Sequence, residues 1–200
     1  NLSDQEATAL RELVQRRGNR EPLQHILGTA SFCGLEMKVN SSVLVPRPET
    51  ELFAEEGWKF LNSLGRESTF LDFGTGSGCI AISLCHHAQQ ARGWALDPSK
   101  EALTIAAANA ANSSVAERIT FVEGNGLSAV SSNLRFDLII SNPPYIPSEE
   151  INMLQEEVRN YDPRSALDGG SDGLDFYRLL AKDAANQLAA RGKLMLEFGD

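Results

Sequence analysis

Five short apolar segments alternate with segments of helical periodicity from residue 50 to the end of the chain, and this alternation leaves few folds open. The predicted strands lie at residues 69–73, 92–97, 119–123, 136–141 and 193–198, and the predicted helices at residues 50–62, 78–88, 100–111 and 174–190. Strands that alternate with helices pair in parallel, because each helix carries the chain back across the sheet in a right-handed crossover. The sequence therefore predicts a doubly wound, mostly parallel α/β sheet.

A glycine-rich turn, Gly74-Thr75-Gly76-Ser77-Gly78, joins the first of these strands to the helix that follows. Its glycines allow the backbone to approach a ligand closely, and the helix N-terminus directs N–H groups at that ligand. The turn alone does not decide the function, because dinucleotide-binding enzymes use a similar one. The second strand ends in Asp97, where a carboxylate can accept both hydroxyls of a ribose. The alternative for Asp97 is a cap for the helix that begins near Ser99.

The fourth strand is followed directly by Asn142-Pro143-Pro144-Tyr145. Each proline lacks an N–H and fixes φ at about −65°, so no regular element continues and the bend is stiff. The bend leaves free carbonyl groups at the carboxyl edge of the sheet, where open α/β sheets bind ligands. Together with the amide oxygen of Asn142 and the ring of Tyr145, these carbonyls suit a flat group that carries an NH2, such as a carboxamide or an exocyclic amine. The alternative is a proline-rich turn that only closes a buried strand.

The glycine turn, the acid at position 97 and the Asn-Pro-Pro-Tyr turn, in this order, indicate methyl transfer from S-adenosylmethionine rather than hydride transfer. Over nearly its whole length the chain also resembles the protein-(glutamine-N5) methyltransferases that modify the Gly-Gly-Gln loop of translation release factors. Besides the three motifs above, the resemblance is carried by Arg20-Glu21-Pro22-Leu23-Gln24-His25-Ile26-Leu27-Gly28, Val45-Pro46-Arg47-Pro48-Glu49-Thr50-Glu51, Ala166-Leu167-Asp168-Gly169-Gly170 and Leu196-Glu197-Phe198-Gly199. DNA and RNA amino-methyltransferases share the Asn-Pro-Pro-Tyr turn, whereas the Pro-Arg-Pro-Glu-Thr-Glu and Leu-Asp-Gly-Gly segments narrow the family.

This resemblance implies a Rossmann-like class I methyltransferase that uses S-adenosyl-L-methionine, releases S-adenosyl-L-homocysteine and acts on a peptide chain release factor in translation termination. The implied cofactor-binding residues are Asp72, Gly74, Thr75, Gly76, Ser77, Gly78, Asp97, Asn125, Gly126 and Asn142. The implied substrate-binding residues are Asn142, Pro143, Pro144 and Tyr145, of which Asn142, Pro143 and Tyr145 are also catalytic. Asp72 would anchor either the glycine loop or the methionine ammonium group. No metal is implied, because the sulfonium provides the leaving group.

The turn after the third strand departs from the family pattern. Family members usually carry an aspartate there to bind the adenine amino group, whereas this chain has Glu123-Gly124-Asn125-Gly126. Asn125 can still accept a hydrogen bond, but a neutral amide does so with less electrostatic strength than a carboxylate. Gly126 replaces a bulkier residue. We expect weaker adenine binding in consequence.

The chain divides into three predicted parts: residues 1–28 as the last helix of an N-terminal helical domain with a linker, 29–48 as a β-hairpin, and 49–200 as the methyltransferase domain. Ser3-Asp4-Gln5-Glu6 has the form of a capping box that opens the first helix. The hairpin is expected to turn at Asn40-Ser41-Ser42. The polar segment 147–173 is expected to form a lid or a substrate rim. Enzymes of this fold add a helix and an antiparallel hairpin after the fifth strand, and we expect this chain to lack those C-terminal strands.

Composition narrows the list of partners. The net charge is −9 and no run of Lys and Arg stands out, so direct nucleic-acid binding is not expected. No segment has the length of a membrane span and no signal peptide is visible, which predicts a cytoplasmic protein without membrane contact. A mitochondrial or plastid location stays open, because the sequence begins at Asn1 without Met. Cys33, Cys79 and Cys85 are expected to be reduced, and His86-His87 to end a surface helix.

Two other functions compete with methylation of a release factor. An N6-adenine methyltransferase that acts on DNA or RNA would use the same Asn-Pro-Pro-Tyr turn after flipping the base. A fragment that binds the cofactor without catalysis is the other possibility. The acidic balance of the chain argues against the first of these.

Overall fold

The computed structural model describes residues 2–199. Along the chain its helices and strands are α1 (Asp4–Gly18), α2 (Leu23–Leu27), β1 (Thr29–Phe32), β2 (Leu35–Lys38), α3 (Pro48–Ser63), β3 (Ser68–Phe73), α4 (Cys79–His87), β4 (Ala91–Asp97), α5 (Lys100–Asn112), β5 (Ile119–Glu123), β6 (Phe136–Ser141), α6 (Glu156–Tyr161), α7 (Asp175–Asp183) and β7 (Leu188–Leu196). Short 3-10 helices lie at Ala116–Arg118, Leu127–Ala129, Glu150–Met153, Arg164–Ala166 and Ala184–Asn186.

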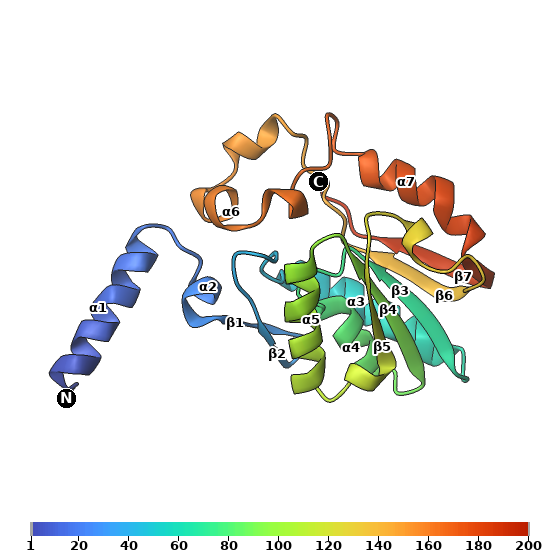
Figure 1. The fold of residues 1–200 in the computed structure, drawn as a ribbon, viewed down its shortest axis with the longest axis horizontal. Coiled ribbons are helices and arrows are strands. Elements are labelled where there is room, and N and C mark those ends of the chain that lie inside the picture. The colour runs from blue at the N-terminus through green and yellow to red at the C-terminus, as the bar shows by residue number, and fades with distance from the viewer. Residues whose placement is uncertain (1, 200) are drawn as a thin grey trace.

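Five parallel strands form the central sheet in the order β5-β4-β3-β6-β7. Neighbouring residues of β6 illustrate how both faces are buried: Leu138 and Ile140 pack with α3 and α4, whereas Ile139 packs with α7. A strand covered on both faces needs a run of apolar residues without alternation, which β6 has at residues 138–140. Figure 1 shows α7 on the opposite side of the sheet from α4 and α5. The prediction of a doubly wound parallel sheet is confirmed.

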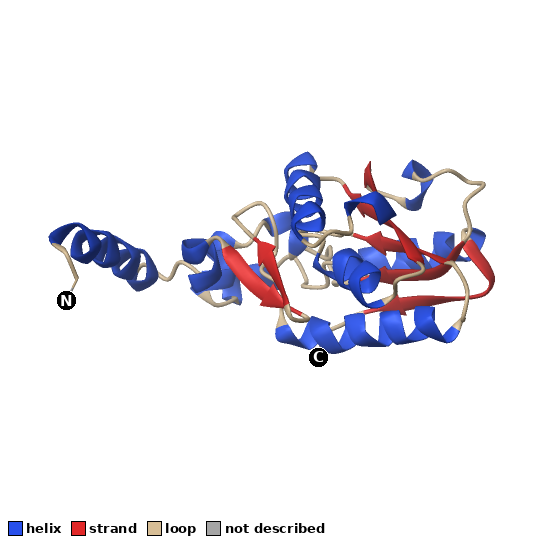
Figure 2. Ribbon diagram, turned by 90° about the horizontal axis from the view of Figure 1, so that it is seen from below, coloured by secondary structure: helices blue, strands red, loops and turns tan. Residues whose placement is uncertain are grey.

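The N-terminal end of α1 forms as its sequence predicts. Ser3 Oγ accepts a hydrogen bond from the Glu6 N–H at 3.3 Å, and the Glu6 carboxylate accepts one from the Ser3 N–H at 2.8 Å, which completes the capping box. The helix buries none of its side chains and projects away from the sheet, as Figures 1 and 2 show. Leu10 and Val14 are exposed on it.

The hairpin turns earlier than the sequence predicts. β1 and β2 pair antiparallel, with Phe32 opposite Leu35, so Cys33 and Gly34 form the turn. Both residues have positive φ, 50° and 77°, as in the type I′ turns that match the twist of a two-residue hairpin. The expected turn at residues 40–42 is therefore wrong as a hairpin turn. Residues 39–47 form no strand, and Val39, Val43 and Val45 pack with Ala102 of α5 instead.

The C-terminal helix and strand also depart from prediction. α7 ends at Asp183, not near residue 190, and β7 already begins at Leu188 and ends at Leu196. The alanine-rich segment between them favours helix by propensity, but the buried Gln187 side chain donates hydrogen bonds to the carbonyls of Leu127 and Val130. This contact and the pairing of β7 with β6 override helix propensity there.

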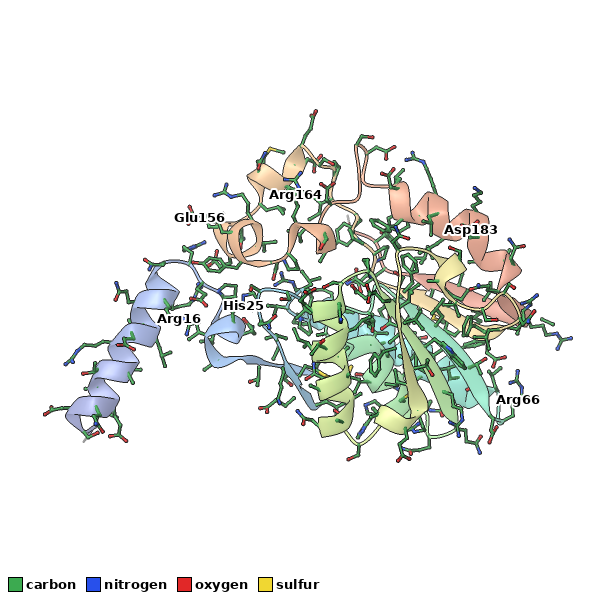
Figure 3. All side chains as sticks on the ribbon, in the orientation of Figure 1. Arg16, His25, Arg66, Glu156, Arg164 and Asp183 are labelled. Carbon is green, nitrogen blue, oxygen red and sulfur yellow. The ribbon has the colours of Figure 1, made fainter. Side chains whose placement is uncertain are left out.

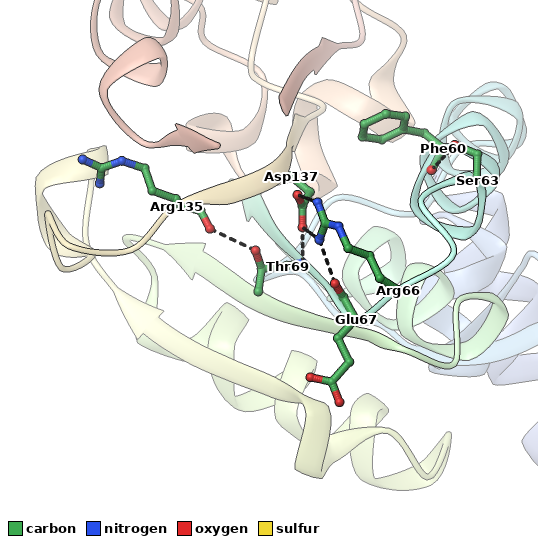
Figure 4. Close-up of polar contacts among 7 residues, drawn as sticks. All are labelled: Phe60, Ser63, Arg66, Glu67, Thr69, Arg135 and Asp137. Atoms are coloured by element: carbon green, nitrogen blue, oxygen red, sulfur yellow. Dashed lines mark hydrogen bonds and ion pairs between the residues drawn. The ribbon is translucent and has the colours of Figure 1, made fainter. Parts of the chain in front are cut away.

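An ion pair closes the amino ends of β3 and β6, away from the edge that carries the predicted motifs. Arg66 donates two hydrogen bonds to the Asp137 carboxylate, at 2.7 and 3.2 Å, and the Thr69 N–H donates a third at 2.9 Å. The Thr69 hydroxyl donates to the Arg135 carbonyl at 2.9 Å, and Figure 4 shows all of these contacts.

None of the helices within residues 2–199 combines the length and apolar character needed to cross a membrane.

Candidate active site

The glycine turn forms a loop between β3 and α4 that is bent over the carboxyl end of β4. The N–H groups of Gly74 and Thr75 both donate to the Leu96 carbonyl, at 2.8 and 3.0 Å. Gly78 has φ of +80°, and a Cβ atom there would lie only 3.0 Å from the Ala106 Cβ. Glycine is therefore required at position 78 for both conformation and space. The N-terminus of α4 therefore packs closely against α5.

Asp72 lies beneath this loop and is fully buried. One carboxylate oxygen accepts hydrogen bonds from the Thr75 hydroxyl at 2.6 Å and from the Ala81 N–H at 3.2 Å, and the other has no partner among the described residues. Burial raises the pKa of Asp72 to about 7; the two hydrogen bonds oppose this rise and the charge of Asp97 adds to it. Of the two roles expected for Asp72, its hydrogen bonds fit the anchoring of the glycine loop.

Asp97 ends β4 and faces the loop from the other side. Its carboxylate accepts hydrogen bonds from the N–H groups of Gly76 and Ser99, each at 2.9 Å. The N-cap of α5 is Ser99, whose hydroxyl oxygen accepts from the Ala102 N–H, so Asp97 does not cap the helix. Burial raises the pKa of Asp97. Each carboxylate oxygen keeps a further lone pair, so the group can still accept hydroxyls from a ligand.

A cavity of about 310 Å³ opens in front of the glycine loop, and we call it the glycine-loop cavity. Its lining residues are Ser42, Val43, Leu44, Phe73, Gly74, Gly76, Leu96, Asp97, Pro98, Ser99, Ala102, Gly124, Asn125, Asn142, Pro144, Pro163, Ser165, Ala166, Asp168 and Phe176. Of the predicted cofactor residues, Gly74, Gly76, Asp97, Asn125 and Asn142 line it, whereas Asp72, Thr75, Ser77, Gly78 and Gly126 do not. The volume is that of a small-molecule site. Mostly apolar walls with the acceptors Asp97 and Asn125 fit an adenine ring attached to a ribose.

A second cavity of about 200 Å³ adjoins the first, and we call it the Tyr145 cavity. Its lining residues are Leu44, Arg47, Asn142, Pro143, Tyr145, Ile146, Val158, Ala166, Leu167 and Glu197. Asn142 lines both cavities, as do Leu44 and Ala166. The Asn-Pro-Pro-Tyr turn therefore stands between a site of nucleoside size and a smaller site that could hold one flat side chain.

The Leu-Asp-Gly-Gly segment supports this turn from behind. Ile146 donates its N–H to the Leu167 carbonyl at 3.0 Å and accepts from the Gly169 N–H at 2.9 Å. A Cβ atom at Gly169 would lie 2.8 Å from the Tyr145 Cα, and one at Gly173 would lie 2.3 Å from the Tyr145 carbonyl oxygen. Only glycine permits this close approach. Segment 147–173 is thus held against the turn and contains α6 and two 3-10 helices.

The same segment also contacts the N-terminal part of the chain. Glu157 of α6 forms ion pairs with Arg17 at 3.1 Å and Arg20 at 2.7 Å, and the Tyr161 hydroxyl donates to the Asn19 carbonyl. Figure 3 shows Glu156 and Arg164 on this segment, with His25 on α2 beneath it. Segment 147–173 therefore joins the N-terminal helices to the rim of the Tyr145 cavity.

Arg47 and Glu51, both from the Pro-Arg-Pro-Glu-Thr-Glu segment, differ in position. Arg47 precedes α3, lines the Tyr145 cavity and forms an ion pair with the buried Asp162. Glu51 lies in the first turn of α3 and lines neither cavity. In the first turn, the Glu51 carboxylate interacts favourably with the dipole of α3.

Sequence reasoning missed three polar residues that support the site. The Asn142 amide nitrogen donates to the Thr50 hydroxyl oxygen at 3.2 Å, and that hydroxyl donates to Glu197 at 3.1 Å. Asn109 of α5 is buried; its amide nitrogen donates to the carbonyls of Ser77 and Lys38, and its oxygen accepts from the Lys38 N–H. An Asn within an alanine-rich helix was a signal for such a role. For Thr50 and Glu197 the sequence carried no signal beyond their motifs.

The cysteines and histidines stay outside both cavities. The three cysteines are free, and His87 stacks on Trp58 at the end of α4 with 4.2 Å between ring centroids. Within the described residues, no three His, Cys, Asp or Glu side chains gather as metal ligands.

A parallel doubly wound sheet with a glycine loop, an acid after the next strand and Asn-Pro-Pro-Tyr at the sheet edge defines an S-adenosylmethionine-dependent class I methyltransferase. Family models agree: the methyltransferase small domain matches residues 55–160, and the PrmC N-terminal domain matches residues 1–28. The release factor glutamine methyltransferase of Geobacter sulfurreducens is 47% identical over 198 residues, covering 99% of this chain and 68% of that protein. That of Caulobacter vibrioides is 40% identical over 200 residues, with coverage of 99% and 68%. The chain belongs to the release factor glutamine methyltransferase family.

Solved structures share the fold at low sequence identity. The hMettl16 catalytic domain in complex with MAT2A 3'UTR hairpin 6 matches with a TM-score of 0.60 and 16% identity, covering 92% of this chain and 64% of that one. A SAM-dependent methyltransferase from Agrobacterium tumefaciens matches with a TM-score of 0.62 and 15% identity, covering 84% and 51%. At these identities the likeness shows the class I methyltransferase fold alone.

Proposed function

We propose that this chain transfers a methyl group from S-adenosylmethionine to the side-chain nitrogen of the glutamine in the Gly-Gly-Gln loop of peptide chain release factors. The observation that carries the proposal is the position of Asn142, which lines the glycine-loop cavity and the Tyr145 cavity at once. A group bound in the Tyr145 cavity would meet the cofactor at this side chain. Family membership supplies the identity of the acceptor.

The glycine-loop cavity would hold the cofactor. Asp97 would accept the ribose hydroxyls, and Asn125 would accept a hydrogen bond from the adenine amino group. Phe73, Leu96 and Phe176 provide apolar walls for the adenine ring. When bound, S-adenosylmethionine supplies an electrophilic methyl group on its sulfonium. The glycine loop, held from below by Asp72, keeps the backbone close to the ligand.

The Asn-Pro-Pro-Tyr turn would bind and orient the acceptor. A glutamine amide nitrogen is a poor nucleophile, because its lone pair is delocalised into the carbonyl, so the chain must supply alignment and charge stabilisation. The Asn142 side-chain oxygen and the Pro143 carbonyl would accept the two amide hydrogens and stabilise the positive charge that grows on the nitrogen. Tyr145, which is 37% exposed, would pack with Pro144 against the amide plane.

Transfer of a labelled methyl group to a purified release factor tests the proposal. The matched controls are the same release factor with the loop glutamine replaced by alanine, together with DNA and tRNA as acceptors. We expect label on the release factor alone, located at the loop glutamine by mass spectrometry. Label on nucleic acid instead would identify an amino-methyltransferase of bases, and equal labelling of the alanine variant would exclude the loop glutamine as the acceptor.

A further inference from the structure

We propose that Thr50 and Glu197 hold the Asn142 side chain in the one orientation that can bind the acceptor amide, so that both are positioning residues. This inference rests on the proposed function, since it assigns a direction to the side chain on which that function depends. Two consecutive hydrogen bonds carry it, from Asn142 to Thr50 at 3.2 Å and from Thr50 to Glu197 at 3.1 Å.

The orientation of Asn142 matters because its two ends have opposite hydrogen-bonding character. The oxygen of a side-chain amide accepts hydrogen bonds and the nitrogen donates them, although the two ends have nearly the same shape. The acceptor nitrogen of a glutamine carries two hydrogens, so it can be bound only by the Asn142 oxygen. A reversed Asn142 would set donors against donors and leave both unpaired in a partly buried site.

Hydrogen-bond polarity fixes the orientation step by step. The Thr50 hydroxyl donates its single proton to a Glu197 carboxylate oxygen, and in its ionised form Glu197 can only accept. Burial raises the pKa of Glu197, and this hydrogen bond opposes the rise. The Thr50 oxygen is then left with lone pairs only, so its other neighbour must be a donor. That donor is the Asn142 NH2 group, and the Asn142 oxygen is left for the acceptor.

Burial keeps other partners away from this chain of contacts. Thr50 is 2% exposed, so water does not compete for its hydroxyl. Glu197 lines the Tyr145 cavity beside Asn142, and its backbone N–H donates to the Ser141 carbonyl at 3.0 Å, which fixes the carboxylate next to the turn. In such a site each hydrogen bond is stronger than in water, and a misdirected one is costly.

Four variants test the inference. Thr50→Val removes the hydroxyl and keeps the shape of the side chain. Glu197→Gln introduces an NH2 group that can donate to the Thr50 oxygen, so the Thr50 hydroxyl proton is no longer directed to residue 197. We expect each to lower the single-turnover methylation rate of a release factor about tenfold, with unchanged affinity for S-adenosylmethionine. Thr50→Ser, which keeps the hydroxyl, should restore most of the rate. Thr69→Val is the matched control, because it removes a hydroxyl bonded to the Arg135 carbonyl at the far end of β3 and should leave the rate unchanged (Figure 4).

A spectroscopic measurement tests the same inference without a release factor. The side-chain amide resonances of Asn142 can be assigned by their loss in Asn142→Ala, and we expect them to shift in Thr50→Val and Glu197→Gln but not in Thr50→Ser or Thr69→Val. If the wild type methylates no release factor, the proposed function fails, and the resonances still decide the inference. If Thr50→Val does not fold, Glu197→Gln decides it. Unshifted resonances in the folded variants, a wild-type rate in them, or a rate for Thr50→Ser as low as that for Thr50→Val would overturn the inference.

Discussion

Asp72 should make the stability of this protein fall as pH rises from about 4 to 8. Its pKa is raised from 3.8 to about 7, with burial as the main cause. An aspartate whose pKa is higher in the folded protein than in the unfolded chain binds its proton more tightly when folded. It therefore stabilises the fold fully below pH 4, and this contribution is lost as pH rises through 7.

The magnitude follows from the size of the shift. Each pH unit corresponds to about 1.4 kcal/mol, so a rise from 3.8 to about 7 amounts to roughly 4 kcal/mol between the two ends of the range. Asp72→Asn cannot ionise and should lack this dependence. Its amide would leave a buried donor beneath the glycine loop, at a cost of about 1–3 kcal/mol that does not vary with pH. The difference between the two proteins isolates Asp72 together with its coupling to Asp97, because titrating groups that do not interact with Asp72 cancel.

Urea denaturation at pH 5, 6, 7 and 8 in the absence of cofactor measures the effect. We expect the free energy of unfolding of Asp72→Asn, relative to the wild type, to increase by about 2–3 kcal/mol over this range. Parallel pH profiles would refute the reasoning, since they would mean that Asp72 is ionised in the folded protein as readily as in the unfolded chain.

Three further substitutions probe the two cavities. Asp97→Ala should weaken S-adenosylmethionine binding by about 1–3 kcal/mol, because the ribose hydroxyls lose their acceptor. If calorimetry shows unchanged affinity, the role of Asp97 is only to accept the hydrogen bonds from the N–H groups of Gly76 and Ser99. Asn125→Asp should tighten cofactor binding, since a carboxylate accepts the adenine amino group more strongly; equal or weaker binding would mean that Asn125 does not face the adenine. Gly169→Ala should lower the melting temperature and the methylation rate together, because its Cβ would lie 2.8 Å from the Tyr145 Cα, and a variant with wild-type values of both would show that the turn yields easily.

The sheet could be predicted from sequence because each strand is marked by a local pattern of residues. Residues 138–140 are apolar on both faces of β6, and the glycine turn marks the change from β3 to α4. The hairpin was misplaced for an equally local reason. By composition, Asn40-Ser41-Ser42 is the stronger turn signal. The observed turn requires a positive φ at Cys33, and a cysteine rarely adopts this conformation, so its residue type does not predict a turn.

Site residues fall into two groups by how they could be found. Asp97 is the last residue of β4 and Asn142 directly follows β6, so their meeting at one sheet edge follows from topology. The contact of Asn142 with Thr50 joins residues separated by 92 positions, and that of Thr50 with Glu197 joins residues separated by 147. No periodicity connects them, since the pairing arises only when α3, β6 and β7 pack together.

The direct test of the central claim is the single-turnover rate at which Asn142 variants methylate a release factor. If the Asn142 oxygen aligns the acceptor amide, Asn142→Ala should lose roughly 3–4 kcal/mol of barrier stabilisation, on the order of 100- to 1000-fold in rate. Its melting temperature and its affinity for S-adenosylmethionine should stay close to those of the wild type. Asn142→Asp keeps the shape and the acceptors and should also bind the cofactor, with a rate lowered by tighter binding of the cofactor ground state. A rate for Asn142→Ala close to that of the wild type would contradict the account and leave the Asn-Pro-Pro-Tyr turn as a structural bend.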